Sequence, residues 1–171
     1  MENNRDKLPF RKNCEGYLIY DGKIICRNTG KGYLEFPGGG VSENEDPAKA
    51  LTREAYEEAG VILEGELKLI KIMHFIWHDN WAKTEKQKKR YNEFKGEEMY
   101  FYAGRVKELI DAPGDSENND PGWPNDERLI LIGEAIKLIE GFKPFPEEMN
   151  EYYEFQLGVL KKLEKTMFNL Y

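Results

Sequence analysis

Apolar and polar residues alternate in short runs through the first third of the chain, a pattern that predicts β-strands. Residues 16–20 and 23–27 are rich in β-branched and aromatic side chains and flank Asp21-Gly22, a dipeptide that favours a tight hairpin turn. A third short strand is predicted at residues 33–36, directly before a run of glycines. Residues 1–13 are mostly polar, and we expect them to form a loose arm.

The same pattern predicts a long strand and a long helix later in the chain. Residues 66–78 carry apolar side chains on both faces, which predicts a strand that is buried on both sides. Apolar residues recur at helical spacing over residues 146–166, which favours a core-packing helix and leaves a dimer contact as an alternative. The other predicted elements are a strand at 99–106, a loop at 111–128, a short strand at 129–132 and a helix at 133–141.

One early stretch predicts a helix with clear ends. Asp46 suits the N-cap position and Pro47 the first helical position, because the N–H group that proline lacks has no partner there. Gly60 is placed to end the helix in the left-handed conformation. Four apolar residues of the helix lie along one side at helical spacing and are expected to face the core: Ala48, Leu51, Ala55 and Ala59.

The same helix carries three glutamates on a neighbouring stripe. Glu54, Glu57 and Glu58 are spaced i, i+3 and i+4, so their like charges repel one another. A divalent cation would remove that cost, and carboxylates favour Mg²⁺ or Mn²⁺ over zinc. His74 and His78 are the only histidines, and their predicted place on a strand favours a structural or substrate-contact role. The helix therefore predicts a metal site built from oxygen ligands.

The spacing of these residues resembles the signature of the Nudix hydrolases. Gly39 is followed by five residues, Glu45, seven residues and then the run from Arg53 to Val61, and the approach to it is Phe36-Pro37-Gly38. The resemblance covers residues 39–61 of the 171-residue chain. It implies the Nudix fold, an α+β protein of α/β/α sandwich type with a mixed sheet flanked by helices. We expect a single domain over residues 1–171.

The resemblance also implies an activity and a set of metal ligands. Family members hydrolyse a pyrophosphate bond in a nucleoside diphosphate linked to another moiety, with Mg²⁺ or Mn²⁺ as cofactor. The last two glutamates of the signature, here Glu57 and Glu58, coordinate the metal, and the carbonyl of Gly38 often joins them. Glu54 is a ligand or the base that activates water. Arg53 pairs with a carboxylate to fix the geometry, and Glu45 is one candidate partner.

Further site residues are expected outside the signature. Many family members recruit another base or ligand, and Glu98 and Glu127 are the two candidates here. The segment 79–97 is rich in lysine and arginine, which predicts a solvated hairpin tip or, alternatively, a lid whose cations meet substrate phosphates. The expected substrate-binding residues are Arg27, Gly39, Trp81, Lys89 and Arg90.

Composition narrows the class of protein. A net charge of −7 argues against a general nucleic-acid binder. Cys14 and Cys26 lack metal-site spacing, and we expect both to be reduced and buried. No signal peptide or membrane-spanning run is evident in the sequence. We expect a cytoplasmic protein without a membrane partner, present as a monomer or a homodimer.

The sequence leaves the substrate open. Residues 75–78 hold neither the proline typical of ADP-sugar hydrolases nor the tyrosine typical of dinucleoside polyphosphate hydrolases. A nucleoside triphosphate or an oxidised (d)NTP is therefore the leading substrate. The alternatives are ADP-ribose or a nucleotide sugar, a dinucleoside polyphosphate, a capped RNA 5′ end and a non-catalytic nucleotide-sensing module. Isoprenoid diphosphate isomerisation would need a cysteine in the site.

Overall fold

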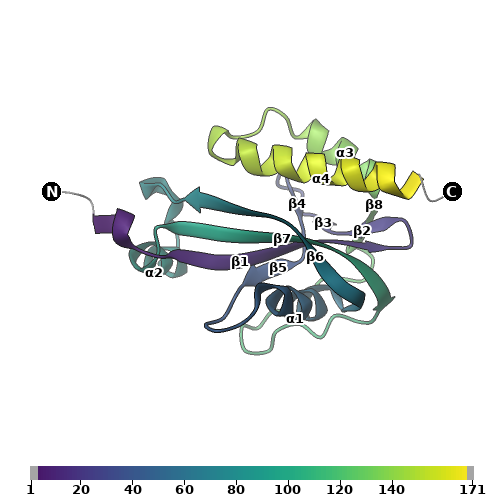
Figure 1. The fold of residues 1–171 in the computed structure, drawn as a ribbon, viewed down its shortest axis with the longest axis horizontal. Coiled ribbons are helices and arrows are strands. Elements are labelled where there is room, and N and C mark those ends of the chain that lie inside the picture. Colours follow the sequence, from purple (N-terminus) through teal and green to yellow (C-terminus); the bar gives the residue numbers. More distant parts are fainter. Residues whose placement is uncertain (1–3, 169–171) are drawn as a thin grey trace.

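A mixed β-sheet with helices on both faces forms the centre of the molecule (Figure 1). The computed structural model describes residues 4–168. Helix α1 (Pro47–Ala59) covers one face, and α3 (Ile132–Gly141) and α4 (Asn150–Phe168) lie on the other. The predicted α+β sandwich is therefore confirmed. Over residues 4–168, no helix is both long and apolar enough to cross a membrane.

The strands follow the order β6-β7-β1-β2-β8, and β5 also pairs with β1. The neighbours β1 and β7 are parallel, whereas the other pairs of this sheet are antiparallel. A separate pair, β3 with β4, forms a small second sheet. The strands are β1 (Phe10–Tyr20), β2 (Lys23–Ile25), β3 (Arg27–Asn28), β4 (Leu34–Glu35), β5 (Gly38–Gly40), β6 (Val61–Ile76), β7 (Gly96–Leu109) and β8 (Leu129–Leu131).

Helix α1 begins and ends where the sequence predicts. The Asp46 carboxylate accepts hydrogen bonds from the N–H groups of Ala48 (2.9 Å) and Lys49 (3.3 Å), which caps the first turn. Gly60 ends the helix at φ 63° and ψ 31°, a left-handed conformation that glycine adopts without a Cβ clash. The fully buried residues of the helix are Ala50, Leu51, Ala55 and Ala59, whereas the predicted Ala48 is half-buried.

The prediction of a strand buried on both sides at residues 66–78 is wrong. The strand β6 lies at an edge of the sheet, and Leu69, Ile72 and Ile76 are 46%, 39% and 55% exposed. An edge strand has one neighbour, and the covering helices do not enclose it, so an apolar side chain there can face solvent. Apolar composition alone does not separate an edge strand from a central one.

Two segments expected to be irregular are ordered. The predicted arm contains a 3₁₀ helix, η1 (Asn4–Lys7), and the start of β1 at Phe10; residues 1–3 of that arm lie outside the described residues. The predicted hairpin tip at 79–97 contains η2 (Asp79–Trp81) and the helix α2 (Glu85–Glu93). Thr84 and Gln87 form a capping box at the start of α2, which satisfies its first N–H groups.

Smaller differences concern the ends of elements. The hairpin turn at Asp21-Gly22 is confirmed, with φ of 47° and 74° at its two residues. The glycine run forms the strand β5 instead of a loop, and η3 (Glu147–Met149) precedes α4 in the predicted last helix. Both cysteines are free and buried, as predicted.

Candidate active site

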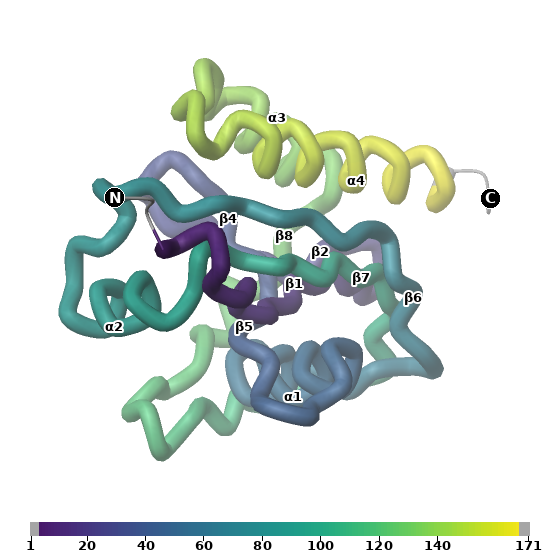
Figure 2. Tube along the Cα trace, turned by 60° about the vertical axis from the view of Figure 1, so that its left-hand side comes forward, coloured from purple at the N-terminus to yellow at the C-terminus, as the bar shows by residue number. Residues whose placement is uncertain are grey.

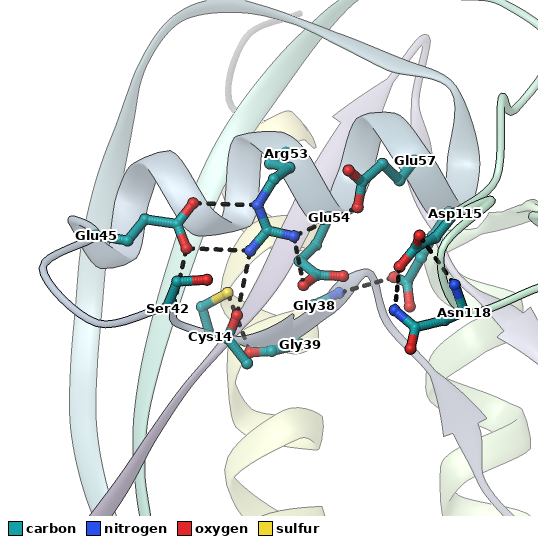
Figure 3. Close-up of polar contacts among 12 residues, drawn as sticks. Cys14, Gly38, Gly39, Ser42, Glu45, Arg53, Glu54, Glu57, Asp115 and Asn118 are labelled. Carbon is teal, nitrogen blue, oxygen red and sulfur yellow. Dashed lines mark hydrogen bonds and ion pairs between the residues drawn. The ribbon is translucent and has the colours of Figure 1, made fainter. Parts of the chain in front are cut away.

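Two of the three glutamates of α1 contact the glycine strand β5, and the third, Glu57, is joined to Arg53 (Figure 3). Glu58 accepts a hydrogen bond through Oε2 from the N–H of Gly38 (3.0 Å). The carboxylate of Glu54 lies against Gly39, where a Cβ atom would come within 2.6 Å of its Cδ. Glu57 is joined to the same group through Arg53 Nη1 (3.3 Å). The helical spacing therefore brings all three carboxylates to one side of α1, as predicted.

Arg53 joins Glu54 and Glu57 to Glu45 in one network. Its Nε and Nη2 donate to the two oxygens of Glu45 (3.1 Å each), which confirms the predicted pair. Its Nη1 donates to Glu54 (2.8 Å), and its Nη2 also donates to the carbonyl of Gly40 (3.2 Å). The hydrogen bond to Glu45 raises the pKa of Arg53, and the reciprocal bond lowers the pKa of Glu45. A planar guanidinium is suited to fixing several oxygen atoms at once.

Burial disfavours the charged forms of two of the glutamates. It raises the pKa of Glu58 to about 8, although the N–H of Gly38 acts in the opposite direction, and the charge of Glu54 adds to the rise. Burial also raises the pKa of Glu54, and the hydrogen bond from Arg53 opposes that effect. Crowded, partly desolvated carboxylates fit a hard divalent cation, because its charge would compensate theirs and its preferred ligands are oxygens.

The three carboxylates are not preorganised as a metal-binding site. Among residues 4–168, no group of three or more His, Cys, Asp or Glu side chains stands in metal-binding geometry. Glu57 and Glu54 instead point to Arg53, and Glu58 points to the backbone of β5. Holding one metal ion between them would therefore require these side chains to rotate.

The long loop between β7 and β8 docks on the end of α1. Four consecutive carbonyls, which the helix itself leaves without partners, accept hydrogen bonds from this loop. The loop thus holds the backbone that carries the glutamates. Its content of Pro, Gly, Asn and Asp predicts a loop but not this role. The bonds run from Gly114 N to Glu57 O (2.9 Å), Trp123 N to Glu58 O (2.6 Å), Arg128 Nη1 to Ala59 O (2.8 Å) and Ile110 N to Gly60 O (2.9 Å).

This loop also brings two aspartates toward the glutamates, which sequence reasoning missed. The charge of Asp115 adds to the raised pKa of Glu54, and that of Asp120 to the raised pKa of Glu58. Figure 3 shows Asp115 and Asn118 beside the end of α1. The Asp115 carboxylate accepts hydrogen bonds within its own loop from the N–H groups at positions 117 and 118.

The two residues predicted outside the signature lie on β7 and at the end of the docked loop. Glu98 on β7 accepts a hydrogen bond from the Tyr100 hydroxyl (2.6 Å) and contacts His74 Nε2 (2.8 Å). The Tyr100 bond lowers the pKa of Glu98. Glu127 lies exposed at the end of the docked loop. Within residues 4–168, neither side chain forms a hydrogen bond or ion pair with the three glutamates.

The predicted substrate-binding residues divide into two groups. Arg27 pairs with Glu35 (2.6 Å) and lies over the Trp123 ring (5.1 Å), so it stands beside the docked loop, and Gly39 lies directly under Glu54. The other group belongs to the segment around α2, at one end of the sheet (Figure 1). There Trp81 stacks on Trp77, with ring centroids 3.8 Å apart, and Lys89 and Arg90 belong to α2 itself.

Cys14 lies at the floor of the site. Its Sγ faces the carbonyl of Gly39 (3.5 Å), and burial raises the pKa of the thiol to about 12. The side chain therefore stays a neutral thiol at physiological pH.

Replacing Gly39 with Ala is expected to impair the site without unfolding the protein. The new Cβ would lie 2.6–2.8 Å from the Glu54 carboxylate, a flexible group that must move away. We expect the activity to fall roughly tenfold, as for a perturbed metal-ligand environment, with little change in melting temperature. Gly158→Ala is the control, because its Cβ meets nothing within 4 Å. Equal activities of the two variants would contradict the placement of Glu54.

Comparisons with known proteins agree with the signature. A family model described as NUDIX domain matches residues 15–142. An RNA pyrophosphohydrolase of Vibrio atlanticus (strain LGP32) is 38% identical over 56 residues, which cover 28% of this chain and 33% of that protein. An RNA pyrophosphohydrolase of Psychromonas ingrahamii is 35% identical over 71 residues, or 36% of this chain and 39% of that protein. The chain thus spans little more than a third of the length of these curated relatives.

The fold also has a counterpart among solved structures. A NUDIX hydrolase from Nitrosomonas europaea superposes with a TM-score of 0.53 at 18% identity, over 87% of this chain and 90% of that chain. This likeness concerns the arrangement of the sheet and its flanking helices.

Proposed function

The chain belongs to the Nudix hydrolase family, and from this we propose that it uses Mg²⁺ or Mn²⁺ to hydrolyse a pyrophosphate bond of a nucleotide. The resemblance found at residues 39–61 is confirmed by the family match over residues 15–142. The family match also supports the predicted enzyme class, a Nudix pyrophosphohydrolase. Nudix enzymes generally use divalent metal ions and act on nucleotide substrates. The choice between Mg²⁺ and Mn²⁺ and the identity of the nucleotide belong to the proposal.

One observation carries the proposal: the three carboxylates of α1 are held by contacts with the glycine strand β5 and with Arg53. Arg53 holds the side chains of Glu54 and Glu57, and the N–H of Gly38 binds that of Glu58. The docked loop holds the carbonyls of Glu57 and Glu58. In our proposal, Glu57, Glu58 and the Gly38 carbonyl hold the metal. The metal, when bound, lowers the pKa of a water ligand and compensates phosphate charge. Glu54 acts as a further ligand or as the base that accepts the proton of the attacking water.

A group outside the signature completes the proposed site. Glu98 and Glu127 remain candidates, and we add Asp120, because its charge acts on Glu58. Full activity of the variants Glu98→Ala and Glu127→Ala, together with a loss in Asp120→Asn, would favour the loop aspartate. Full activity in all three would remove the need for such a group.

Two substrate classes have support. A nucleoside triphosphate or oxidised (d)NTP is the leading substrate, because the markers of other subfamilies are absent from the sequence. The second is a phosphorylated RNA 5′ end, because the curated relatives are RNA pyrophosphohydrolases and α2 exposes several lysines. The predicted cytoplasmic location and the choice between monomer and homodimer stay predictions.

The test is a release assay for phosphate and nucleoside monophosphate with Mg²⁺, with Mn²⁺ and with EDTA. The panel holds triphosphates, oxidised triphosphates, ADP-ribose, nucleotide sugars, dinucleoside polyphosphates and 5′-triphosphorylated or capped RNA. Turnover that EDTA abolishes supports the proposal and identifies the substrate class. Absence of turnover from a folded, metal-binding protein would overturn it in favour of a nucleotide-sensing module.

A further inference from the structure

Arg11 is a half-buried cation at the start of β1. Its Nη1 donates to the side-chain oxygen of Asn13. Over residues 4–168 it takes part in no ion pair. Removing a guanidinium from water costs free energy unless an anion or several acceptors compensate. A neutral amide oxygen compensates only part of that cost, so Arg11 has capacity for another acceptor.

This guanidinium lies close to the candidate active site. A Cβ atom at Gly40 would come within 2.3 Å of Arg11 Nη2, and the carbonyl of the same Gly40 accepts a hydrogen bond from Arg53 (3.2 Å). Two guanidinium groups thus flank one glycine at the end of β5. The charge of Glu54 is also near enough to act on Arg11. Arg11 therefore lies at the border of the candidate active site, on the side of Gly40.

The helix α2 packs beside the start of β1 and carries a second cation, Arg90. The N-terminal segment runs alongside this helix (Figure 2). Arg5 donates to the carbonyls of Tyr91 and Phe94 (3.1 Å to the latter), and its guanidinium lies 3.2 Å from the centre of the Tyr91 ring. The N–H of Lys95 donates to the carbonyl that precedes β1 (3.0 Å). These contacts fix the last turn of α2, which carries Arg90, against the amino end of β1.

The two cations repel one another in the free protein. Burial lowers the pKa of Arg11, and the charge of Arg90 lowers it further. Glu97 compensates part of this charge: burial raises its pKa, and both arginines act in the opposite direction. Glu54, whose charge also acts on Arg11, is already paired with Arg53. Glu97 is thus left to compensate both Arg11 and Arg90, which leaves an excess of positive charge. Such an arrangement is stabilised by an added anion.

We propose that Arg11 and Arg90 form an anion subsite for the substrate. The subsite binds a phosphate group that is not part of the pyrophosphate bond that is cleaved. The substrate class in this proposal rests on the proposed function, whereas the location of the subsite rests on the two arginines. Guanidinium groups bind phosphate oxygens in a bidentate manner, which fixes orientation as well as charge. The bound phosphate is a further phosphate of a nucleoside triphosphate chain or a phosphodiester of an RNA 5′ end, which share this chemistry.

Binding of inorganic tripolyphosphate in EDTA, measured by calorimetry, tests the subsite without metal or turnover. We expect Arg11→Gln and Arg90→Gln each to weaken binding by about tenfold to a hundredfold, the usual loss for a charge-assisted hydrogen bond. Lys86→Gln on the same helix is the matched control, because Lys86 is exposed, and we expect a change below about twofold. Equal losses in all three variants, or none in the folded arginine variants, would overturn the proposal.

Thermal unfolding separates loss of the subsite from loss of the fold. Because Arg90→Gln removes a repulsion, we expect its melting temperature without anion to equal or exceed that of the wild type, while the rise induced by tripolyphosphate shrinks. A lower melting temperature in Arg90→Gln with an unchanged rise would contradict the subsite.

Steady-state kinetics with Mg²⁺ then identify the phosphate. A KM increase for both a nucleoside triphosphate and a 5′-triphosphorylated dinucleotide assigns the subsite to the phosphate chain. An increase confined to the dinucleotide assigns it to the diester. If no substrate is hydrolysed but the arginine variants still lose tripolyphosphate binding, the proposed function fails and the subsite stands.

Discussion

Replacing Glu58 with Gln is expected to reduce kcat/KM by on the order of a thousandfold, the effect of losing several kcal/mol of transition-state stabilisation by a bound metal. In the wild type, Glu58 Oε2 accepts a hydrogen bond from the N–H of Gly38 (3.0 Å). Glutamine keeps an oxygen that can accept this bond but removes the negative charge. A folded protein with a weakened metal site should result. Steady-state kinetics over a range of Mn²⁺ concentrations measure both the turnover and the apparent metal affinity.

The same substitution is expected to change how the stability of the folded protein depends on pH. The folded-state pKa of Glu58 is raised from 4.5 to about 8 by burial, so the folded protein binds this proton more tightly than the unfolded chain. In EDTA the wild type should therefore lose stability as the pH rises from about 4.5 toward 8, and Glu58→Gln should lose less. Glu66→Gln, an exposed change on β6, is the control for both measurements. Undiminished metal-dependent turnover in Glu58→Gln would refute the assigned role.

The helix of the candidate site was predictable because its signals are local. Asp46 and Pro47 mark its start, Gly60 marks its end, and the spacing of the glutamates fixes which side they share. Each of these signals acts within one or two helical turns, so the sequence contains them without knowledge of the fold. The pair between Arg53 and Glu45 also joins residues only eight positions apart.

The rest of the site depends on contacts between distant parts of the chain. Gly114 and Trp123 bind carbonyls of α1 that lie more than 50 residues earlier, and no local pattern announces such a pairing. The sequence alone predicts a loose arm at Arg11, because its strand is set by parallel pairing with β7, where Arg11 is opposite Glu97. The charge excess beside it becomes visible only when Arg90 is placed in space.

The helix α2 was not predicted, although the sequence contains a local signal for its start. Thr84 and Gln87 are spaced as in a capping box, but the high content of charged residues in this segment favoured a solvated loop. A short helix with little apolar surface is stabilised mainly by its caps and its neighbours. Here the neighbour is the N-terminal segment, through Arg5.

Replacing Gly60 with Ala is expected to destabilise the protein by about 3 kcal/mol and to lower its melting temperature by roughly 6–12 °C. The residue adopts φ 63°, and a Cβ there would lie 2.1 Å from the carbonyl oxygen of Ile110, so the docked loop must move. Gly65→Ala is the matched control, because Gly65 has φ 72° with open space around it, and it should lose only about 1 kcal/mol. Urea titration of both variants measures the difference. Equal stability of the two variants would show that the loop is not docked at the end of α1. Because the displaced loop also holds the carbonyls of Glu57 and Glu58, Gly60→Ala should lower metal-dependent activity even at temperatures where the protein is folded.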